Sequence, residues 1–274
     1  GRIGFSPRAL AAIPGGTLDP DIIPKYQMPL IIPPAMPRTG KIVVKGGKRI
    51  DYYEIAVRQF QQQILPPGMP ATTVWSYGSA NHPGSFNYPA FTIEAKWRAP
   101  VRVKWINDLK DPVTGNFLPH LLPVDPTRHW ANPPGGDAGR DMRPMFMETP
   151  GPYNGPVPLV THLHGARSTQ ESDGYAEAWY LPAANDVPAG YATEGTWYNS
   201  FKMEFQGQQG VAWQPGSAVF QYANDQRATT LWYHDHTLGM TRLNVYAGPA
   251  GFYLLRGGPD DKVTGTLPGP APKL

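Results

Sequence analysis

The sequence predicts an all-β protein, built as a Greek-key sandwich or barrel, and three observations lead to this class. Glycine (30) and proline (33) are frequent among the 274 residues, as expected for short strands joined by turns. Only 16% of the residues are charged, too few for a long-helix or coiled-coil protein. Aromatic residues make up 12%, which provides core material and argues against disorder. Many short β-rich runs between turn residues then favour a sandwich or barrel.

The N-terminal 40 residues differ from the rest, because prolines recur there without any periodicity. We expect residues 1–40 to form an extended arm whose apolar side chains lie against another surface. From Lys41 onward, IVVKGGKRIDYYEIAVRQF predicts a strand, a Gly-Gly turn and a second, alternating strand. Three further runs predict strands: TTVWSYG, FTIEAKW and VRVKWIND.

Residues 107–157 are rich in glycine, proline and polar residues, and we expect surface loops and insertions there. The second half of the chain predicts more strands, in the runs VPLVTHLHG, KMEFQ, VFQYAND, TTLWYHDH and AGFYLLR. A helical turn is expected within residues 237–249. Residues 41–256 therefore form one predicted domain, and the non-periodic residues 257–274 resemble an interdomain linker.

Charge and cysteine content exclude several classes of function. The 24 Lys and Arg residues against 21 Asp and Glu give a net charge of +3, without the charged block typical of a nucleic-acid tail. No run of about 18 apolar residues predicts a membrane span. Because cysteine is absent, this chain carries no disulfide, thiolate metal site or thiol nucleophile. Its first residue is Gly, from which we expect a processed or truncated N-terminus.

Four of the seven histidines form two His-X-His pairs, His162 with His164 and His234 with His236. In a strand, residues i and i+2 point to the same face, about 6.5–7 Å apart along the backbone. Such spacing allows two imidazoles to reach one metal ion or two adjacent ions. An all-imidazole ligand set suits copper, zinc, iron or nickel and excludes magnesium and calcium. The two pairs therefore predict a metal site.

The segments around both pairs resemble a known family. THLHG followed by SDGYAEAWY, together with LWYHDHTLGMTRLNVYAGPAGFYLL, are similar to the first cupredoxin domain of three-domain multicopper oxidases. The similarity is to the type that includes bacterial spore-coat laccase, bilirubin oxidase and phenoxazinone synthase. It runs from about Lys41 to Arg256, and residues 125–157 match none of its motifs. It implies a cupredoxin-like fold and copper as the cofactor.

The resemblance also implies a role for each histidine. His162 would bind the type 2 copper, His164 and His234 would share one type 3 copper, and His236 would bind the other. Asp173, in the SDG turn, resembles a carboxylate that assists proton delivery near the cluster. The alternative for Asp173 is an ordinary Asp-Gly turn residue. Asp235 lies between two ligands on the opposite face of its strand, so we expect it to be structural.

The absence of cysteine departs from the family pattern. In the family, the third domain supplies the remaining histidines of the trinuclear cluster, two of them flanking the cysteine of the type 1 copper. The resemblance therefore implies a second polypeptide, or further domains, with which O2 is reduced to water while a phenolic or similar substrate is oxidised. It also implies a secreted, periplasmic, spore-coat or cell-surface location.

Two other functions remain open from the residues alone. The four histidines could hold copper for storage or delivery without oxidase activity. A zinc-dependent hydrolase would need a general base, for which Glu177 is the candidate, although no motif surrounds it.

Several residues near these motifs carry simpler expectations. We expect the Pro-rich loops to leave three histidines solvated: His82, His120 and His129. Trp232 and Tyr233, next to the ligands, are expected to wall the site.

Overall fold

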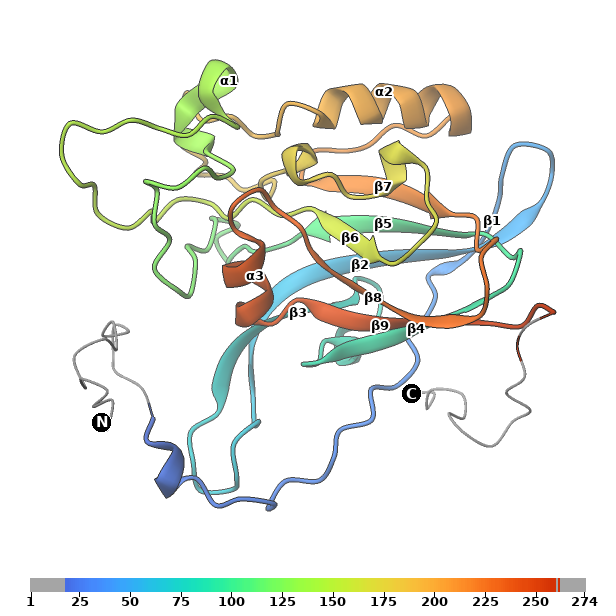
Figure 1. Ribbon diagram of the computed structural model, residues 1–274, viewed down its shortest axis with the longest axis horizontal. Coiled ribbons are helices and arrows are strands. Elements are labelled where there is room, and N and C mark those ends of the chain that lie inside the picture. The colour runs from blue at the N-terminus through green and yellow to red at the C-terminus, as the bar shows by residue number, and fades with distance from the viewer. Residues whose placement is uncertain (1–17, 260, 262–274) are drawn as a thin grey trace, which may run out of the picture.

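A computed structural model describes residues 18–259 and 261, and in this part of the chain the strands form two sheets (Figure 1). The first sheet contains β1 (Gly40–Val43), β2 (Arg49–Gln62), β5 (Val101–Asn107) and β7 (Ser217–Tyr222), in that order, with β3 (Thr72–Ser79) also paired to β2. The second has the order β4 (Ala90–Lys96), β9 (Ala250–Arg256), β8 (Thr229–Asp235) and β6 (Thr161–His164). The expected all-β, cupredoxin-like class is confirmed.

Both sheets mix parallel and antiparallel pairs. β2 runs parallel to β5, and β4 runs parallel to β9, whereas the other pairs are antiparallel. Strands that lie side by side but far apart in sequence require long crossovers between the sheets. This arrangement brings β6 and β8, which carry the two histidine pairs, together at one edge of the second sheet.

Aromatic side chains join the two sheets across the core. Tyr233 of β8 packs between Tyr77 of β3 and Trp105 of β5, with ring centroids 5.0 and 5.3 Å apart respectively. Its hydroxyl donates a hydrogen bond to the carbonyl of Phe91. The expectation that Tyr233 walls the metal site is therefore wrong. Alternation along β8 turns Tyr233 inward and places Trp232 and His234 on the other face.

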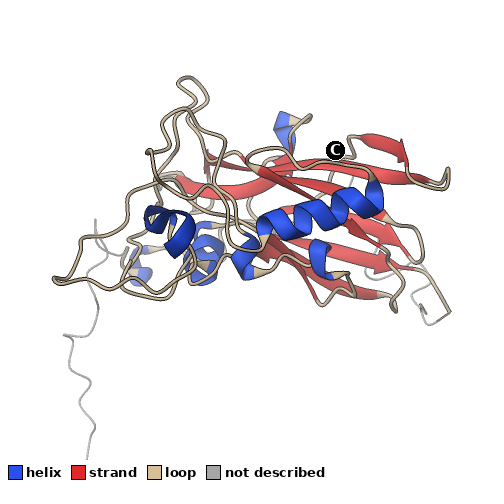
Figure 2. Ribbon diagram, turned by 90° about the horizontal axis from the view of Figure 1, so that it is seen from above, coloured by secondary structure: helices blue, strands red, loops and turns tan. Residues whose placement is uncertain are grey.

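Helices are few and short. The longest, α2 (Tyr198–Gln209), lies beside β7 (Figure 1) and is the long blue helix in front of the strands in Figure 2. The expectation of a strand at KMEFQ, residues 202–206, is wrong. Phe201 and Phe205 are spaced by four residues, which places both on one buried face of a helix, and Gly210 ends that helix in the left-handed conformation.

The expected helical turn near residue 241 is α3 (Thr241–Ala247). The remaining short elements are α1 (Gly136–Gly139), η2 (Pro20–Ile22), η3 (Pro83–Ser85), η4 (Pro133–Gly135), η5 (Gln170–Ser172) and η6 (Ala176–Ala178).

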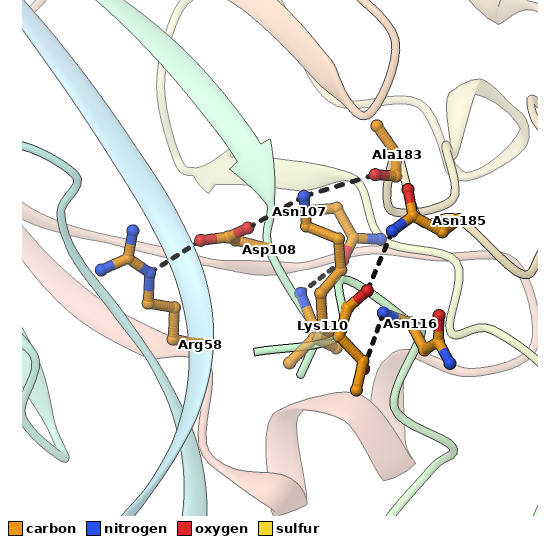
Figure 3. A network of polar contacts seen from close by, with 9 residues as sticks. Arg58, Asn107, Asp108, Lys110, Asn116, Ala183 and Asn185 are labelled. Atoms are coloured by element: carbon orange, nitrogen blue, oxygen red, sulfur yellow. Dashed lines mark hydrogen bonds and ion pairs between the residues drawn. The ribbon is translucent and has the colours of Figure 1, made fainter. Parts of the chain in front are cut away.

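The segment 107–157 is irregular, as expected, but it is not confined to the surface. Trp130 and Tyr153 are buried, with ring centroids 4.8 Å apart, and their apolar surface extends the core. The beginning of the segment is fixed by charge (Figure 3). Asp108 pairs with Arg58 of β2 at 2.7 Å and with Lys110 at 3.5 Å, and Lys110 also donates to the carbonyl of Ala183.

Little regular structure occurs in the described part of the two terminal segments. Residues 18–39 contain η2 and an isolated bridge between Ala35 and Thr92 of β4. Residues 1–17 of the expected arm, and residues 260 and 262–274 of the expected linker, lie outside the described residues. Within the described part of the chain, no helix has both the length and the apolar character needed to cross a membrane.

Candidate metal centre

The two histidine pairs face each other across one strand pair. β6 and β8 are antiparallel, and their register places His162 directly opposite His234, with His164 opposite Trp232. His236 follows the last residue of β8, where its backbone N–H donates to the carbonyl of Val160 at 2.8 Å. Residues directly opposite in an antiparallel pair bring their side chains close together on the same face. The strand pairing alone therefore gathers the histidines.

The four imidazoles form one cluster. The ring of His162 lies 5.6 Å from that of His164, 5.7 Å from that of His234 and 4.9 Å from that of His236. Trp232 stacks on His164 and covers His234, at ring distances of 5.4 and 3.9 Å. The expectation that Trp232 walls the site is thus met, and the wall lies on the His164 side.

Hydrogen bonds to the backbone decide which ring nitrogens remain free. Nδ1 of His162 donates to the carbonyl of Asp173 at 2.5 Å, which leaves Nε2 with its lone pair. Nδ1 of His234 donates to the carbonyl of Asp235 at 2.7 Å, and its free Nε2 faces Nδ1 of His164 at 3.2 Å. Two nitrogens bound tetrahedrally to one ion at about 2.0 Å would lie about 3.3 Å apart. His164 and His234 therefore fit two ligands of a single ion.

Burial favours the neutral form of two of the four imidazoles, His234 and His236. Desolvation, together with the neighbouring histidines, lowers the pKa of His234 to about 4, although its hydrogen bond to the Asp235 carbonyl raises the pKa in part. The pKa of His236 is also lowered, mainly by burial. Neutral imidazoles with free lone pairs are ligands for copper or zinc at neutral pH.

The ligand set supplied by the described residues is incomplete. Nδ1 of His236 is buried without a hydrogen-bond partner in the described structure, an arrangement that is costly unless another group completes it. Among the described residues, no three His, Cys, Asp or Glu side chains converge closely enough to hold an ion by themselves. The four imidazoles fit copper ions that take further ligands from outside these residues.

Asp173 contacts the cluster mainly through its backbone. Its carbonyl accepts the hydrogen bond from His162, while its carboxylate accepts one from the Ser168 hydroxyl at 2.6 Å. The second carboxylate oxygen lies 3.8 Å from Nδ1 of His162. The structure thus places Asp173 beside His162, and its part in proton delivery remains a prediction.

Comparison with known proteins identifies the family, although no protein-family model matches the chain. A laccase of Bacillus stratosphericus is 35% identical over 215 residues, covering 77% of this chain and 30% of the laccase. A laccase of Bacillus subtilis (strain 168) is 34% identical over 212 residues, and one of Haloferax volcanii is 35% identical over 232 residues. The chain belongs to the multicopper oxidases.

Copper is the cofactor of this oxidoreductase family, and the chain corresponds to an N-terminal region of it. The chain spans about 30% of the length of these three curated laccases. Among solved structures, a multicopper oxidase from Campylobacter jejuni, described as a metallo-oxidase, is 16% identical with a TM-score of 0.48. That similarity covers 93% of this chain and 33% of the other.

Asp235 of this multicopper oxidase chain has the structural role expected of it. Its side chain is fully buried on the face opposite the ligands, where both carboxylate oxygens accept hydrogen bonds. Desolvation raises the pKa of Asp235, and the hydrogen bonds from Thr237, Asn244 and Val160 offset part of this rise. The resulting pKa is about 6.

The expectation that His120 is solvated is wrong, whereas His82 and His129 are exposed as expected. The His120 ring packs edge-on against Trp75, with centroids 4.6 Å apart, and Nε2 donates to Oδ1 of Asn244 at 2.9 Å. The flanking sequence LPHLLP offered one signal, because apolar neighbours on both sides are unusual for a solvated loop.

His120 should make the stability of the protein depend on pH. Burial lowers its pKa to about 4, whereas an unfolded histidine titrates near 6.5. As pH falls, the unfolded chain takes up this proton first, so the free energy of unfolding should drop between about pH 6.5 and 4. Because the ring is partly exposed, we expect a contribution of at most about 2–3 kcal/mol.

Urea unfolding of the wild type and His120→Gln at pH 7.5 and 4.5 measures this contribution. The variant lacks the titrating ring, so the stability difference between the two proteins should shrink at pH 4.5. A difference that stays constant with pH would show that His120 is not held in its neutral form.

Gly174 lets the turn that holds His162 approach β6. At its φ of +82°, an added Cβ would lie 2.1 Å from the carbonyl oxygen of Thr161 and 2.9 Å from Cα of His162. Gly174→Ala should therefore lower the free energy of unfolding by about 3 kcal/mol or more, as measured by urea denaturation.

Gly190→Ala is the matched control for Gly174→Ala. Its φ is +84°, but an added Cβ would meet nothing within 4 Å, so only the backbone strain of about 1 kcal/mol applies. Equal losses in the two variants would show that the close approach of Gly174 to β6 does not stabilise the protein.

Proposed function

We propose that this chain supplies four imidazoles to a trinuclear copper site of a laccase-like multicopper oxidase, at which O2 is reduced to water. One observation carries the proposal: the strand pairing of β6 with β8 sets His162 opposite His234 and gathers four histidines into an incomplete ligand set. Residues 41–256 would form its cupredoxin-like domain, residues 1–40 an arm, and residues 257–274 an interdomain linker.

Each histidine would have a separate role in this site. His164 and His234 would share one type 3 copper, which the 3.2 Å separation of their facing nitrogens supports. His236 would bind the other type 3 copper, and the unpartnered nitrogen of its ring supports a further group there. His162 would bind the type 2 copper through Nε2, the nitrogen left free by its bond to Asp173.

Copper, when bound, supplies the one-electron redox steps that O2 reduction requires. The chain's own residues orient and shield the ligands. The carbonyls of Asp173 and Asp235 fix the rings of His162 and His234, and Trp232 covers the His164 side. The Asp173 carboxylate, held by Ser168, would keep a proton close to His162.

The remaining parts of the enzyme would lie on a second polypeptide or on further domains. A type 1 copper ligated by cysteine must be among them, because this sequence contains no cysteine. A phenolic or similar reductant would be oxidised there, which makes this chain the O2-reducing side of the enzyme. Its place in this family favours a secreted, periplasmic, spore-coat or cell-surface location.

O2 uptake by the copper-loaded assembly, with a phenolic reductant and an assay for hydrogen peroxide, tests the proposal. We expect O2 consumption that depends on the phenol and releases no peroxide. Copper binding without O2 uptake would instead indicate a storage or delivery module. Hydrolytic activity that depends on zinc and on Glu177 would favour the zinc hydrolase.

A further inference from the structure

A chain of buried hydrogen bonds leads from the metal ligands to a loop histidine. Asp235, which separates the ligands His234 and His236, accepts hydrogen bonds at both carboxylate oxygens. Oδ1 accepts from the backbone N–H of Val160 at 3.1 Å and from the Thr237 hydroxyl at 2.7 Å. Oδ2 accepts from the backbone N–H of Thr237 at 3.0 Å and from the Asn244 amide at 2.9 Å. The carboxylate thereby ties Thr237 and Asn244, which follow the second histidine pair, to Val160, which precedes the first.

The same residue also orients a ligand directly. The backbone carbonyl of Asp235 accepts the Nδ1 hydrogen of His234 at 2.7 Å, and Val160, held by its carboxylate, accepts the backbone N–H of His236 at 2.8 Å. A displacement of Asp235 would therefore move the hydrogen-bond partners of both ligands in the pair.

Asn244 connects Asp235 to His120. The Asn244 side chain is fully buried on α3; its amide donates to Asp235 and to the carbonyl of Pro158, and its Oδ1 accepts from Nε2 of His120 at 2.9 Å. An asparagine amide can adopt two orientations related by a flip, and its hydrogen-bond partners select between them. The Nε2 donor of His120 and the two acceptors, Asp235 and Pro158, all select the orientation in which the nitrogen faces the carboxylate.

The protonation of His120 is itself fixed by its surroundings. The backbone N–H of Leu122 donates to Nδ1 of His120 at 2.8 Å, so the ring hydrogen must reside on Nε2. The ring is packed against Trp75. The loop that carries it begins at Asp108, which is paired with Arg58 and Lys110 (Figure 3). His120 is thus a preorganised hydrogen-bond donor.

We propose that His120 is a positioning residue for the metal centre: through Asn244 it fixes Asp235, and Asp235 orients His234 and His236. The inference rests on the proposed copper site. Without the His120 donor, Oδ1 of the buried Asn244 loses its hydrogen-bond partner, and the side chain can shift away from Asp235 toward another donor. The Asp235 carboxylate would then no longer be held in one position, and the rings of His234 and His236 would no longer be held in one orientation.

Two substitutions at His120 separate this role from simple packing. In His120→Asn, the shorter side chain can still accept from the N–H of Leu122 but cannot reach Asn244. In His120→Gln, the terminal amide can replace the Nε2 donor. His129→Asn is a matched control, because His129 is exposed and bonds only to the carbonyl of Asp141 among the described residues.

Two measurements on the full chain follow these variants. Proton–nitrogen NMR of the metal-free protein reports the Asn244 side-chain amide and the ring nitrogens of His234, and titration with Cu(II) reports metal affinity. We expect His120→Asn to shift both sets of resonances and to weaken Cu(II) binding about tenfold. His120→Gln should restore the wild-type resonances and most of the affinity, and His129→Asn should leave both unchanged.

Wild-type Asn244 and His234 resonances in a folded His120→Asn variant would overturn the inference. So would equal losses in the Asn and Gln variants, because packing would then account for the effect.

If the wild type binds no Cu(II), the proposed function fails, and the NMR comparison still decides whether His120 orients Asn244 and His234. If His120→Asn does not fold, Asn244→Asp, which places a second carboxylate beside Asp235, should produce the same His234 shift, and its absence counts against the inference.

Discussion

Replacing His234 by alanine in the copper-loaded assembly should lower O2 reduction by more than about 100-fold and release copper from the site. His234 is the most buried of the four ligands, with 4% of its surface exposed, and its Nε2 faces Nδ1 of His164 at 3.2 Å. Removing the ring leaves His164 without the nitrogen that would share its ion. Copper content by atomic absorption, together with O2 uptake, measures both effects.

His82→Ala is the control for this loss. His82 is exposed, and among the described residues its ring bonds only to the nearby hydroxyl of Ser79, so removal of the ring should change neither copper content nor O2 uptake. Full copper content and activity in His234→Ala would remove His234 from the ligand set.

Asp235→Ala should lower the free energy of unfolding by about 3–5 kcal/mol at pH 7. The substitution removes the acceptor shared by four buried donors: the backbone N–H groups of Val160 and Thr237, the Thr237 hydroxyl and the Asn244 amide. Only the last two also contact the carbonyl of Pro158. Relief of the buried charge offsets part of this cost, because the carboxyl has a raised pKa of about 6. Urea denaturation of the metal-free chain gives the difference.

Asp137→Ala provides the comparison for Asp235→Ala. The Asp137 side chain is 92% exposed and pairs with Arg140 at 3.4 Å, so its loss should change stability by no more than about 0.5 kcal/mol. A loss of less than about 1 kcal/mol in Asp235→Ala would contradict the role assigned to the buried carboxylate.

The strands and the histidine pairs follow from local sequence patterns. Alternation sets His162 with His164, and His234 with His236, on one face of each strand, and this could be predicted from residue spacing. The pairing of β6 with β8 is a long-range contact, and only the family resemblance indicated that the two pairs meet. The structure supplies the register, with His162 opposite His234.

The wrong expectations for KMEFQ and for His120 also arise from contacts between residues far apart in the sequence. Polar and apolar residues alternate in KMEFQ, which locally favours a strand. A helix forms instead because it places Phe201 and Phe205 on one face, which packs against Trp213 and the rest of the core. His120 lies in a Pro-rich loop, and its partner Asn244 is 124 residues further along the chain. No local pattern relates two such residues, so the loop could not be predicted to contribute to the surroundings of the site.

Anomalous diffraction at the copper edge, from crystals of the copper-loaded assembly, tests the central claim most directly. The account predicts a trinuclear group of copper peaks, with one peak at Nε2 of His162, one between Nδ1 of His164 and Nε2 of His234, and one at the ring of His236. Copper peaks found only away from these four rings would contradict the account.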